Sequence, residues 1–275
     1  MNNISIIIPV HEYNDKMLEY LTKAFDSIVA QEGIDELPQT LIVFPTAIET
    51  EIKEFVESQI RKHQDKGITH KSFYLVNNFD KTDYQSQVNL AVKSVNTPYF
   101  SVLEFDDEYG KAYIKNAEKY IASYSDIDVF LTMMIEVNDR NEGVKITNET
   151  VWAQQFVGEN GEMGYLNLNA LKQYTDFKLS GAVIKKSEFE NLGGYKSNIK
   201  LTFMYEFLLR ALNNACKIFS IPKIGYKHLF NREGSLFDVY SKTMPVNERK
   251  FWFETATKES NFPKDRMIDM SLLKK

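Results

Sequence analysis

The first 107 residues alternate short apolar runs with amphipathic stretches, and this alternation constrains the fold more than any other feature. Residues 4–10 form a continuous, mostly β-branched run, which is typical of a strand buried on both faces. Further apolar runs follow at 41–44, 73–76 and 99–105, and stretches with helical spacing of apolar residues separate them. The sequence therefore predicts an α/β fold in which helices flank a Rossmann-like, mostly parallel central sheet.

The pattern changes after residue 107, and the order returns only near residue 178. A helical stripe at 113–121 and an apolar run at 129–137 come first, followed by a polar, irregular stretch over 138–164. Further on, the pattern predicts a helix at 203–212, a strand at 217–221 and a helical tail over the last 40 or so residues. We expect one domain over 1–236, with halves at 1–107 and 108–236, and a C-terminal helical tail over 237–275.

Composition and charge narrow the function classes. The chain has 275 residues, a formal net charge of −5 and a single cysteine, Cys216. The mildly acidic balance argues against non-specific binding to nucleic acid, although a local basic patch stays compatible with it. One cysteine excludes an intrachain disulfide framework and a four-cysteine zinc site. No segment approaches the roughly 18 apolar residues of a membrane span, so we expect a cytoplasmic protein without one.

Three carboxylates follow the predicted strand at 99–105. Glu104 and Asp106 should project to one side of that strand, with Asp107 in the turn beyond. Ligands of open α/β sheets bind at the carboxyl ends of the strands, and oxygen-rich clusters suit Mg²⁺ or Mn²⁺. The alternative is a solvated acidic loop. No glycine-rich loop follows a strand, so a bound phosphate would have to be held by a metal and by side chains.

Several short segments follow one another along the chain in a fixed order: ISIIIPVHEYN (4–14), QVN (87–89), NTPYFSVLEFDD (96–107), LSGAVIK (179–185), LGGY (192–195), EFLLR (206–210), IP (221–222) and YKHLFNREGS (226–235). In this order they resemble the segments of family 2 glycosyltransferases, which have the GT-A fold. The resemblance covers about residues 4–236. It implies a metal-dependent, inverting enzyme that moves a sugar from a nucleoside diphosphate sugar, bound by the first half of the domain, to an acceptor bound by the second half.

The resemblance also assigns roles to individual residues, together with Mn²⁺ or Mg²⁺ as cofactor. Glu104 and Asp106 stand at the acidic metal-binding positions, with Asp107 beside them, and the metal would neutralise charge on the departing diphosphate. The remaining assignments place Pro9, His11 and Glu12 along the nucleotide, Asn89 as support for the nucleotide pocket, and His228 and Arg232 on the other side of the diphosphate as a metal ligand or a cation.

The sequence departs from the family pattern at three places. The first acidic position is Glu104 rather than an aspartate, and residues 43–46 lack the acid that reads the nucleobase. The family's catalytic base would fall on Met204. Glu206 is the nearest acid and can serve as the base, but it can equally pair with Arg210 four residues later. If Glu206 is structural, the base should be sought among Glu159, Glu162 and Asp176.

Two functions from different classes follow from these features. The first is the glycosyltransferase, whose acceptor could be a glycan, a lipid-linked sugar, a protein or a modified nucleobase. The second is a catalytically degenerate GT-A domain that binds a nucleotide sugar or a glycan, or serves in assembly. A sugar-phosphate nucleotidyltransferase would share the α/β layout, but no glycine-rich basic loop follows the first strand.

Overall fold

The computed structural model describes residues 3–11, 16–65, 67–68, 72–149, 164–268 and 270. Along the chain the elements are β1 (Ile4–Pro9), α1 (Met17–Val29), β2 (Thr40–Pro45), η1 (Thr46–Ile48), α2 (Glu49–Gln64), β3 (Ser72–Asn77), α3 (Tyr84–Ser94), β4 (Tyr99–Val102), β5 (Glu108–Tyr109), α4 (Tyr113–Ser123), β6 (Val129–Val137), β7 (Gly143–Thr147), α5 (Leu168–Gln173), β8 (Val183–Lys185), α6 (Lys186–Asn191), α7 (Phe203–Asn213), β9 (Ile218–Leu229), α8 (Leu236–Thr243) and α9 (Val246–Glu259).

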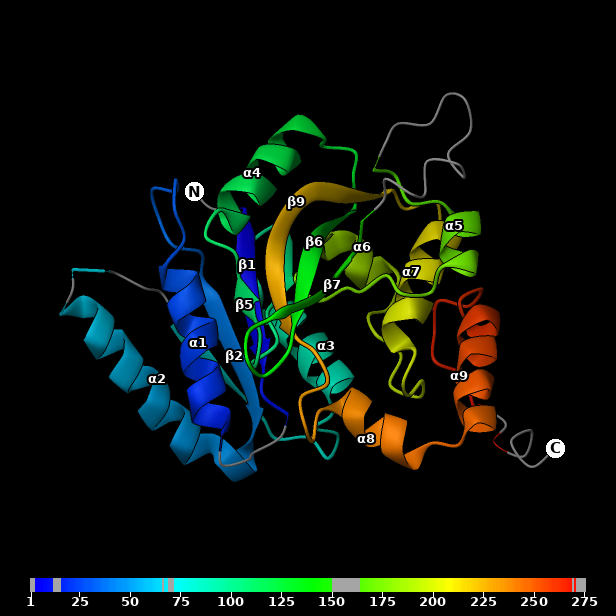
Figure 1. Ribbon diagram of the computed structural model, residues 1–275, viewed down its shortest axis with the longest axis horizontal. Coiled ribbons are helices and arrows are strands. Elements are labelled where there is room, and N and C mark those ends of the chain that lie inside the picture. The colour runs from blue at the N-terminus through cyan, green and yellow to red at the C-terminus, as the bar shows by residue number, and fades with distance from the viewer. Residues whose placement is uncertain are drawn as a thin grey trace.

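One mixed sheet runs through the molecule in the order β3-β2-β1-β4-β8-β6-β9-β5, with β7 paired to β6 (Figure 1). Strands β3, β2, β1 and β4 run parallel to one another, Ile7 of β1 stands opposite Val102 of β4, and β4 pairs antiparallel with β8 on its other side. The apolar runs at 4–10 and 99–105 thus contain two adjacent central strands, β1 and β4. Their carboxyl ends meet at one edge of the sheet, which is where a ligand can touch both.

Helices cover both faces of the sheet, which explains the continuous apolar run of β1. Ile6 and Ile8 pack in a core with residues of α1, α2 and α4. Ile7 points to the opposite face, where it belongs to a core with residues of α3, α6, α7 and α9. All three isoleucines have no exposed surface. Period-two alternation thus places apolar side chains into two separate cores, as expected for a strand buried on both faces.

The second half of the sheet differs from the sequence expectation in two places. The predicted strand at 217–221 continues to residue 229 as β9, because it pairs in parallel with the whole of β6 across an irregularity near Met133. The stretch expected to be irregular contains β7, which pairs antiparallel with the end of β6. The extension of β9 places His228 next to Asp107, one of the three predicted carboxylates.

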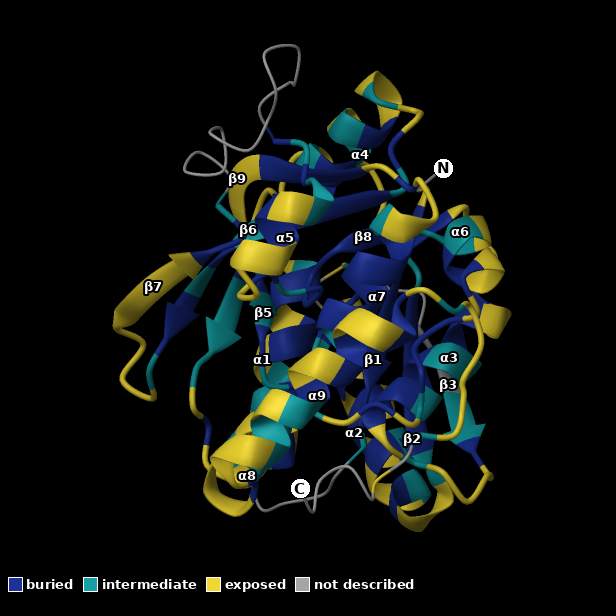
Figure 2. Ribbon diagram, turned by 90° about the vertical axis from the view of Figure 1, so that its right-hand side faces the viewer, coloured by how far each residue is buried: buried dark blue, intermediate teal, exposed yellow. Residues whose placement is uncertain are grey.

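The C-terminal helices follow the expectation of a helical tail that folds back. Trp252 of α9 is buried, its backbone oxygen accepts a hydrogen bond from Thr202 Oγ1 at 2.8 Å, and α9 packs on α7. By contrast, no residue of α8 is buried, and the helix lies along the rim of the molecule (Figure 2). Among the described residues, no helix has the length and apolar character needed to cross a membrane.

Candidate functional site

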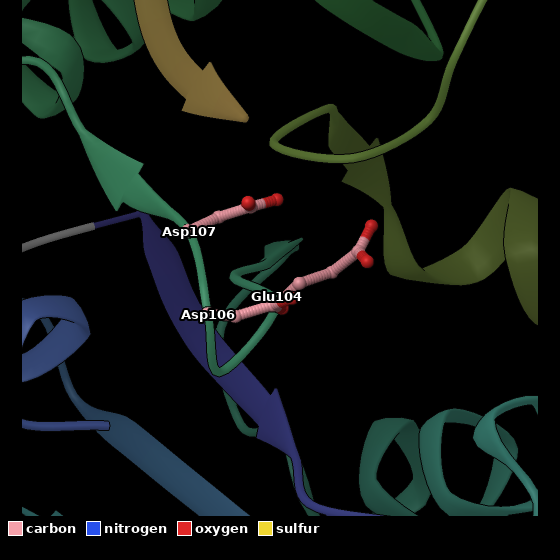
Figure 3. A group of neighbouring side chains, drawn as sticks. All are labelled: Glu104, Asp106 and Asp107. Atoms are coloured by element: carbon pink, nitrogen blue, oxygen red, sulfur yellow. The ribbon is translucent and has the colours of Figure 1, made fainter. Parts of the chain in front are cut away.

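The three predicted carboxylates lie in the turn between β4 and β5. Oxygen atoms of Glu104, Asp106 and Asp107 lie within 4.8 Å of one another, and all three side chains point to the same side of the turn (Figure 3). Strand β4 ends at Val102, so the turn brings them together rather than the strand alternation assumed from the sequence. The Asp107 N–H closes the turn by donating to the Glu104 carbonyl at 3.1 Å.

Glu104 is held by residues from the second half of the domain. Its backbone N–H donates to the Tyr226 hydroxyl at 3.1 Å, and the Ser180 hydroxyl donates to its Oε1. Gly181, next to Ser180, has a φ of +67°. A Cβ at this position would lie 2.2 Å from the Tyr226 ring, so only glycine fits. Burial, and then the negative charge of Asp107, raise the pKa of Glu104 to about 7.

Asp106 is paired with Arg232, which follows β9. Arg232 Nε donates to Asp106 Oδ2, and the guanidinium carbon lies 5.2 Å from the centre of the Phe105 ring and 5.7 Å from that of Tyr20. Burial and the charge of Asp107 raise the pKa of Asp106 to about 6, and the Arg232 charge limits this rise. A cation of the protein itself thus lies directly against the acidic turn.

Asp107 is buried and bound to the end of β9 through both of its oxygens. Oδ2 lies 2.9 Å from His228 Nδ1, and Oδ1 accepts from the Leu229 N–H at 2.9 Å. Burial opposes protonation of His228, but Asp107 and Glu104 outweigh it and raise the pKa of His228 to about 9. His228 is therefore a cation near neutral pH in this arrangement, and its role as a metal ligand stays a prediction.

The donor set fits a hard divalent cation. Three carboxylates converge at the carboxyl edge of the sheet, and two of them have raised pKa values because their negative charges are close together and buried. Both carboxylate oxygens of Asp107 already form hydrogen bonds with residues of β9. Glu104 and Asp106 are therefore the residues best placed to hold Mg²⁺ or Mn²⁺.

Two of the three residues predicted along the nucleotide lie at the end of β1. Pro9 is the last residue of that strand, and the His11 ring packs edge-on against Phe105, with ring centres 6.0 Å apart. His11 is thus a neighbour of the acidic turn. Glu12 lies outside the described residues. Gln87 belongs to the segment QVN, but the sequence had assigned it no role. Its Nε2 donates a hydrogen bond to the Val10 carbonyl at 3.2 Å.

Asn89 makes a different kind of contact. Its Nδ2 donates to the Tyr195 carbonyl at 2.7 Å, and its Oδ1 accepts from the Tyr195 N–H at 2.8 Å. These two bonds join α3 to the turn at residues 193–195 and so tie the two halves of the domain together. Support of the nucleotide pocket by Asn89 stays a prediction, and its direct contacts are with the other half.

Glu206 lies in α7 with no exposed side-chain surface. Its Oε1 lies 2.9 Å from Arg210 Nε and 3.0 Å from Lys196 Nζ, and its Oε2 accepts from Arg210 Nη2 at 2.9 Å. Arg210 donates in addition to the carbonyls of Leu192 and Gly194. These contacts favour the structural alternative stated for Glu206, because a general base has to reach the acceptor hydroxyl.

The sequence missed the residues that hold the acidic turn in place. Ser180 and Tyr226 both contact Glu104, yet neither carries a charge or a motif of its own. Only their positions in the sequence could have indicated them, because both lie in segments that resemble the family. Ser180 lies in the run LSGAVI, and Tyr226 lies two residues before His228.

Solved structures match the fold over nearly the whole chain. Residues 1–349 of S. aureus TarS, in complex with UDP-GlcNAc, match with a TM-score of 0.67 and 18% identity over 99% of this chain and 69% of that one. A longer TarS chain matches with a TM-score of 0.58 and 19% identity over 88% of this chain, which spans only 38% of its length. The mannosyltransferase PcManGT from Pyrobaculum calidifontis, in complex with GDP-Man and Mn²⁺, matches with a TM-score of 0.58 and 11% identity over 95% of this chain and 69% of that one.

No protein-family profile matches the sequence, and no curated protein matches it. At identities below 20%, the structural matches bear on the fold. They confirm the predicted architecture: a mostly parallel α/β sheet flanked by helices and followed by C-terminal helices. The chain therefore has the GT-A fold that is shared by nucleotide-sugar glycosyltransferases.

Proposed function

We propose that this protein is a metal-dependent glycosyltransferase that uses a nucleoside diphosphate sugar as donor. The observation that supports this most directly is the acidic turn: three carboxylates at the carboxyl edge of a GT-A sheet, with Arg232 and His228 beside them. TarS was solved with UDP-GlcNAc and PcManGT with GDP-Man and Mn²⁺, so both a nucleotide sugar and a divalent cation are compatible with this fold.

The side chains of the site divide into anions and cations. Glu104 and Asp106 would hold Mn²⁺ or Mg²⁺, which when bound neutralises charge on the departing diphosphate. Arg232 is next to them and, once released from Asp106, can pair with a diphosphate oxygen. The His11 ring beside Phe105 would border the nucleotide at the end of β1.

The sequence offered four acids as the catalytic base: Glu206 and, as alternatives, Glu159, Glu162 and Asp176. Glu206 is buried against Arg210 and Lys196, and of the alternative acids, Glu159 and Glu162 lie outside the described residues. Asp176 is exposed and lies 2.6 Å from Lys145. The burial of Glu206 favours the second candidate function, a GT-A domain that binds a nucleotide sugar or glycan without transfer, so inversion at the anomeric carbon stays a prediction.

Donor hydrolysis separates the two candidate functions. The protein is incubated with Mn²⁺ and a panel of nucleoside diphosphate sugars, after thermal shift has identified the donors that stabilise it. A glycosyltransferase should slowly release free nucleoside diphosphate without any acceptor, because water replaces the acceptor hydroxyl. Stabilisation by a donor without hydrolysis would support the binding module. No stabilisation by any donor with Mn²⁺ would contradict both the transferase and a module that binds nucleotide sugars.

Binding of Mn²⁺ alone should tighten as the pH rises from about 5.5 to about 8. Burial and mutual repulsion raise the pKa of Asp106 to about 6 and that of Glu104 to about 7, and both must lose their protons to bind a cation. Free Mn²⁺ is measured by its electron paramagnetic resonance signal at each pH. Calorimetry in two buffers of different ionisation enthalpy should detect proton release near pH 6, and an affinity that is constant over this range would contradict the assignment.

A further inference from the structure

A groove of about 480 Å³ lies along the outer side of α3, and the acidic turn contributes nothing to its lining. Helix α3 uses Tyr84, Val88 and Ala91 to pack against the core, while Ser86 and Lys93 on its other side line the groove. The volume lies within the range of small-molecule sites, roughly 300–1,000 Å³. The groove is therefore distinct from the metal and diphosphate site at the acidic turn, and it shares with the predicted nucleotide pocket only the supporting residue Asn89.

The far wall of the groove is built by the chain that follows α9. Gly193 has a φ of +84°, and a Cβ there would lie 2.7 Å from the Pro263 carbonyl oxygen, so a glycine lets the two segments meet. The Ser197 N–H and hydroxyl both donate to Asp265 Oδ2 at 3.2 Å. Lys81 Nζ reaches across from the loop after β3 and donates to Ser197 Oγ at 3.1 Å. These bonds define the shape of the groove before any ligand arrives.

The charges along the groove balance. Lys81 and Lys93 contribute two ammonium groups, and Asp80 and Asp265 contribute two carboxylates. A polyanion would gain from the lysines but would be repelled by the two aspartates. A neutral ligand rich in hydroxyl groups can use both kinds of side chain, because each hydroxyl donates to a carboxylate and accepts from an ammonium.

Phe79 adds an apolar surface at the rim. It lines the groove, and 69% of its surface is exposed, so its ring is open to a ligand in the groove. A flat, exposed aromatic ring next to balanced polar groups matches a sugar ring, whose C–H face is apolar and whose edge carries hydroxyls.

We propose that this groove is a second binding site, for a short neutral oligosaccharide, separate from the site of transfer. The choice of sugar as the ligand class rests in part on the proposed function. The groove begins at Asn77, whose Nδ2 donates to Gln87 Oε1 at 3.3 Å, and Gln87 in turn bonds the Val10 carbonyl beside His11. A glycan held there would lie near the carboxyl end of β1, where the nucleotide sugar is proposed to bind. It would keep a longer acceptor close to the enzyme.

The test is saturation-transfer NMR with neutral tetrasaccharides of glucose, of mannose and of N-acetylglucosamine as probes. We expect transfer to at least one of them, and about three- to tenfold weaker binding in Phe79→Ala, because one aromatic contact is lost. Phe237→Ala is the matched control, since Phe237 is also an exposed aromatic, 59% accessible, but lies on α8 and does not line the groove. It should bind as the unchanged protein does.

Three results would overturn the proposal: no transfer to any tetrasaccharide, equal weakening in both variants, or displacement of the tetrasaccharide by polyphosphate, which would indicate an anionic ligand. Thermal stabilisation by Mn²⁺ and the donor is measured in the same variants and should be unchanged. Phe79-dependent glycan binding in a protein that hydrolyses no donor would support the groove and contradict the transferase. Donor hydrolysis without glycan binding would do the reverse.

Discussion

Asp106→Ala should abolish metal-dependent donor binding and lower turnover by at least about 10²–10³-fold. Asp106 and Glu104 are the two carboxylates best placed to hold a cation, so the variant loses one of the two. It also leaves Arg232 without its carboxylate partner at the turn. The measurement is calorimetry with Mn²⁺ and a nucleoside diphosphate, followed by the rate of donor hydrolysis.

Two further variants make the result specific. Asp106→Asn keeps the size of the side chain but removes its charge, and should lose nearly as much affinity as the alanine variant. Asp139→Ala removes an exposed carboxylate after β6 and should bind and turn over normally. Unchanged affinity for Mn²⁺ and nucleoside diphosphate in Asp106→Ala would mean that the metal site is wrongly assigned.

Glu206→Gln should destabilise the protein by about 3–5 kcal/mol, because it removes the negative partner of two buried cations. Arg210 is fully buried and Lys196 is nearly so, and both contact the Glu206 carboxylate within 3.0 Å. Neither cation can reach water without disturbing α7. Denaturant unfolding monitored by tryptophan fluorescence would measure the change, since Trp252 is buried where α9 packs on α7.

Turnover distinguishes this structural role from catalysis. If Glu206 is structural, turnover per folded molecule should stay within a few-fold of normal at a temperature where the variant is folded. A catalytic base would instead give a loss of about 10²-fold or more with donor binding intact. Glu190→Gln removes an exposed helical carboxylate that lies 3.9 Å from Lys186, and should change neither quantity.

The sequence predicted those parts of the structure that local pattern determines. The doubly buried run of β1 and the acidic residues after β4 could be found because burial on two faces and clustered charge are visible in a single segment. Long-range pairing is not visible in this way. The extension of β9 to Leu229 depends on the pairing partner, β6, and the contacts of Asn89 with Tyr195 join residues 106 positions apart.

The same limit applies to the roles of charged residues. Glu206 had one visible partner, Arg210, at helical spacing, and its second partner, Lys196, comes from a different segment. The enclosure of Glu206 became apparent only when both cations were placed around it. Similarly, the family resemblance predicted Arg232 as a metal ligand or a cation beside the diphosphate, but the sequence did not indicate its pairing with Asp106.

The pairing of Arg232 with Asp106 has a thermodynamic consequence for how ligands enter. A free metal ion must compete with the guanidinium for the same carboxylate, whereas a nucleoside diphosphate that arrives with the metal offers the guanidinium new oxygen partners. Metal and nucleotide should therefore bind with positive cooperativity. Linkage requires that each tightens the other by the same factor, so under the proposed function the metal–nucleotide complex should bind more tightly than the bare ion.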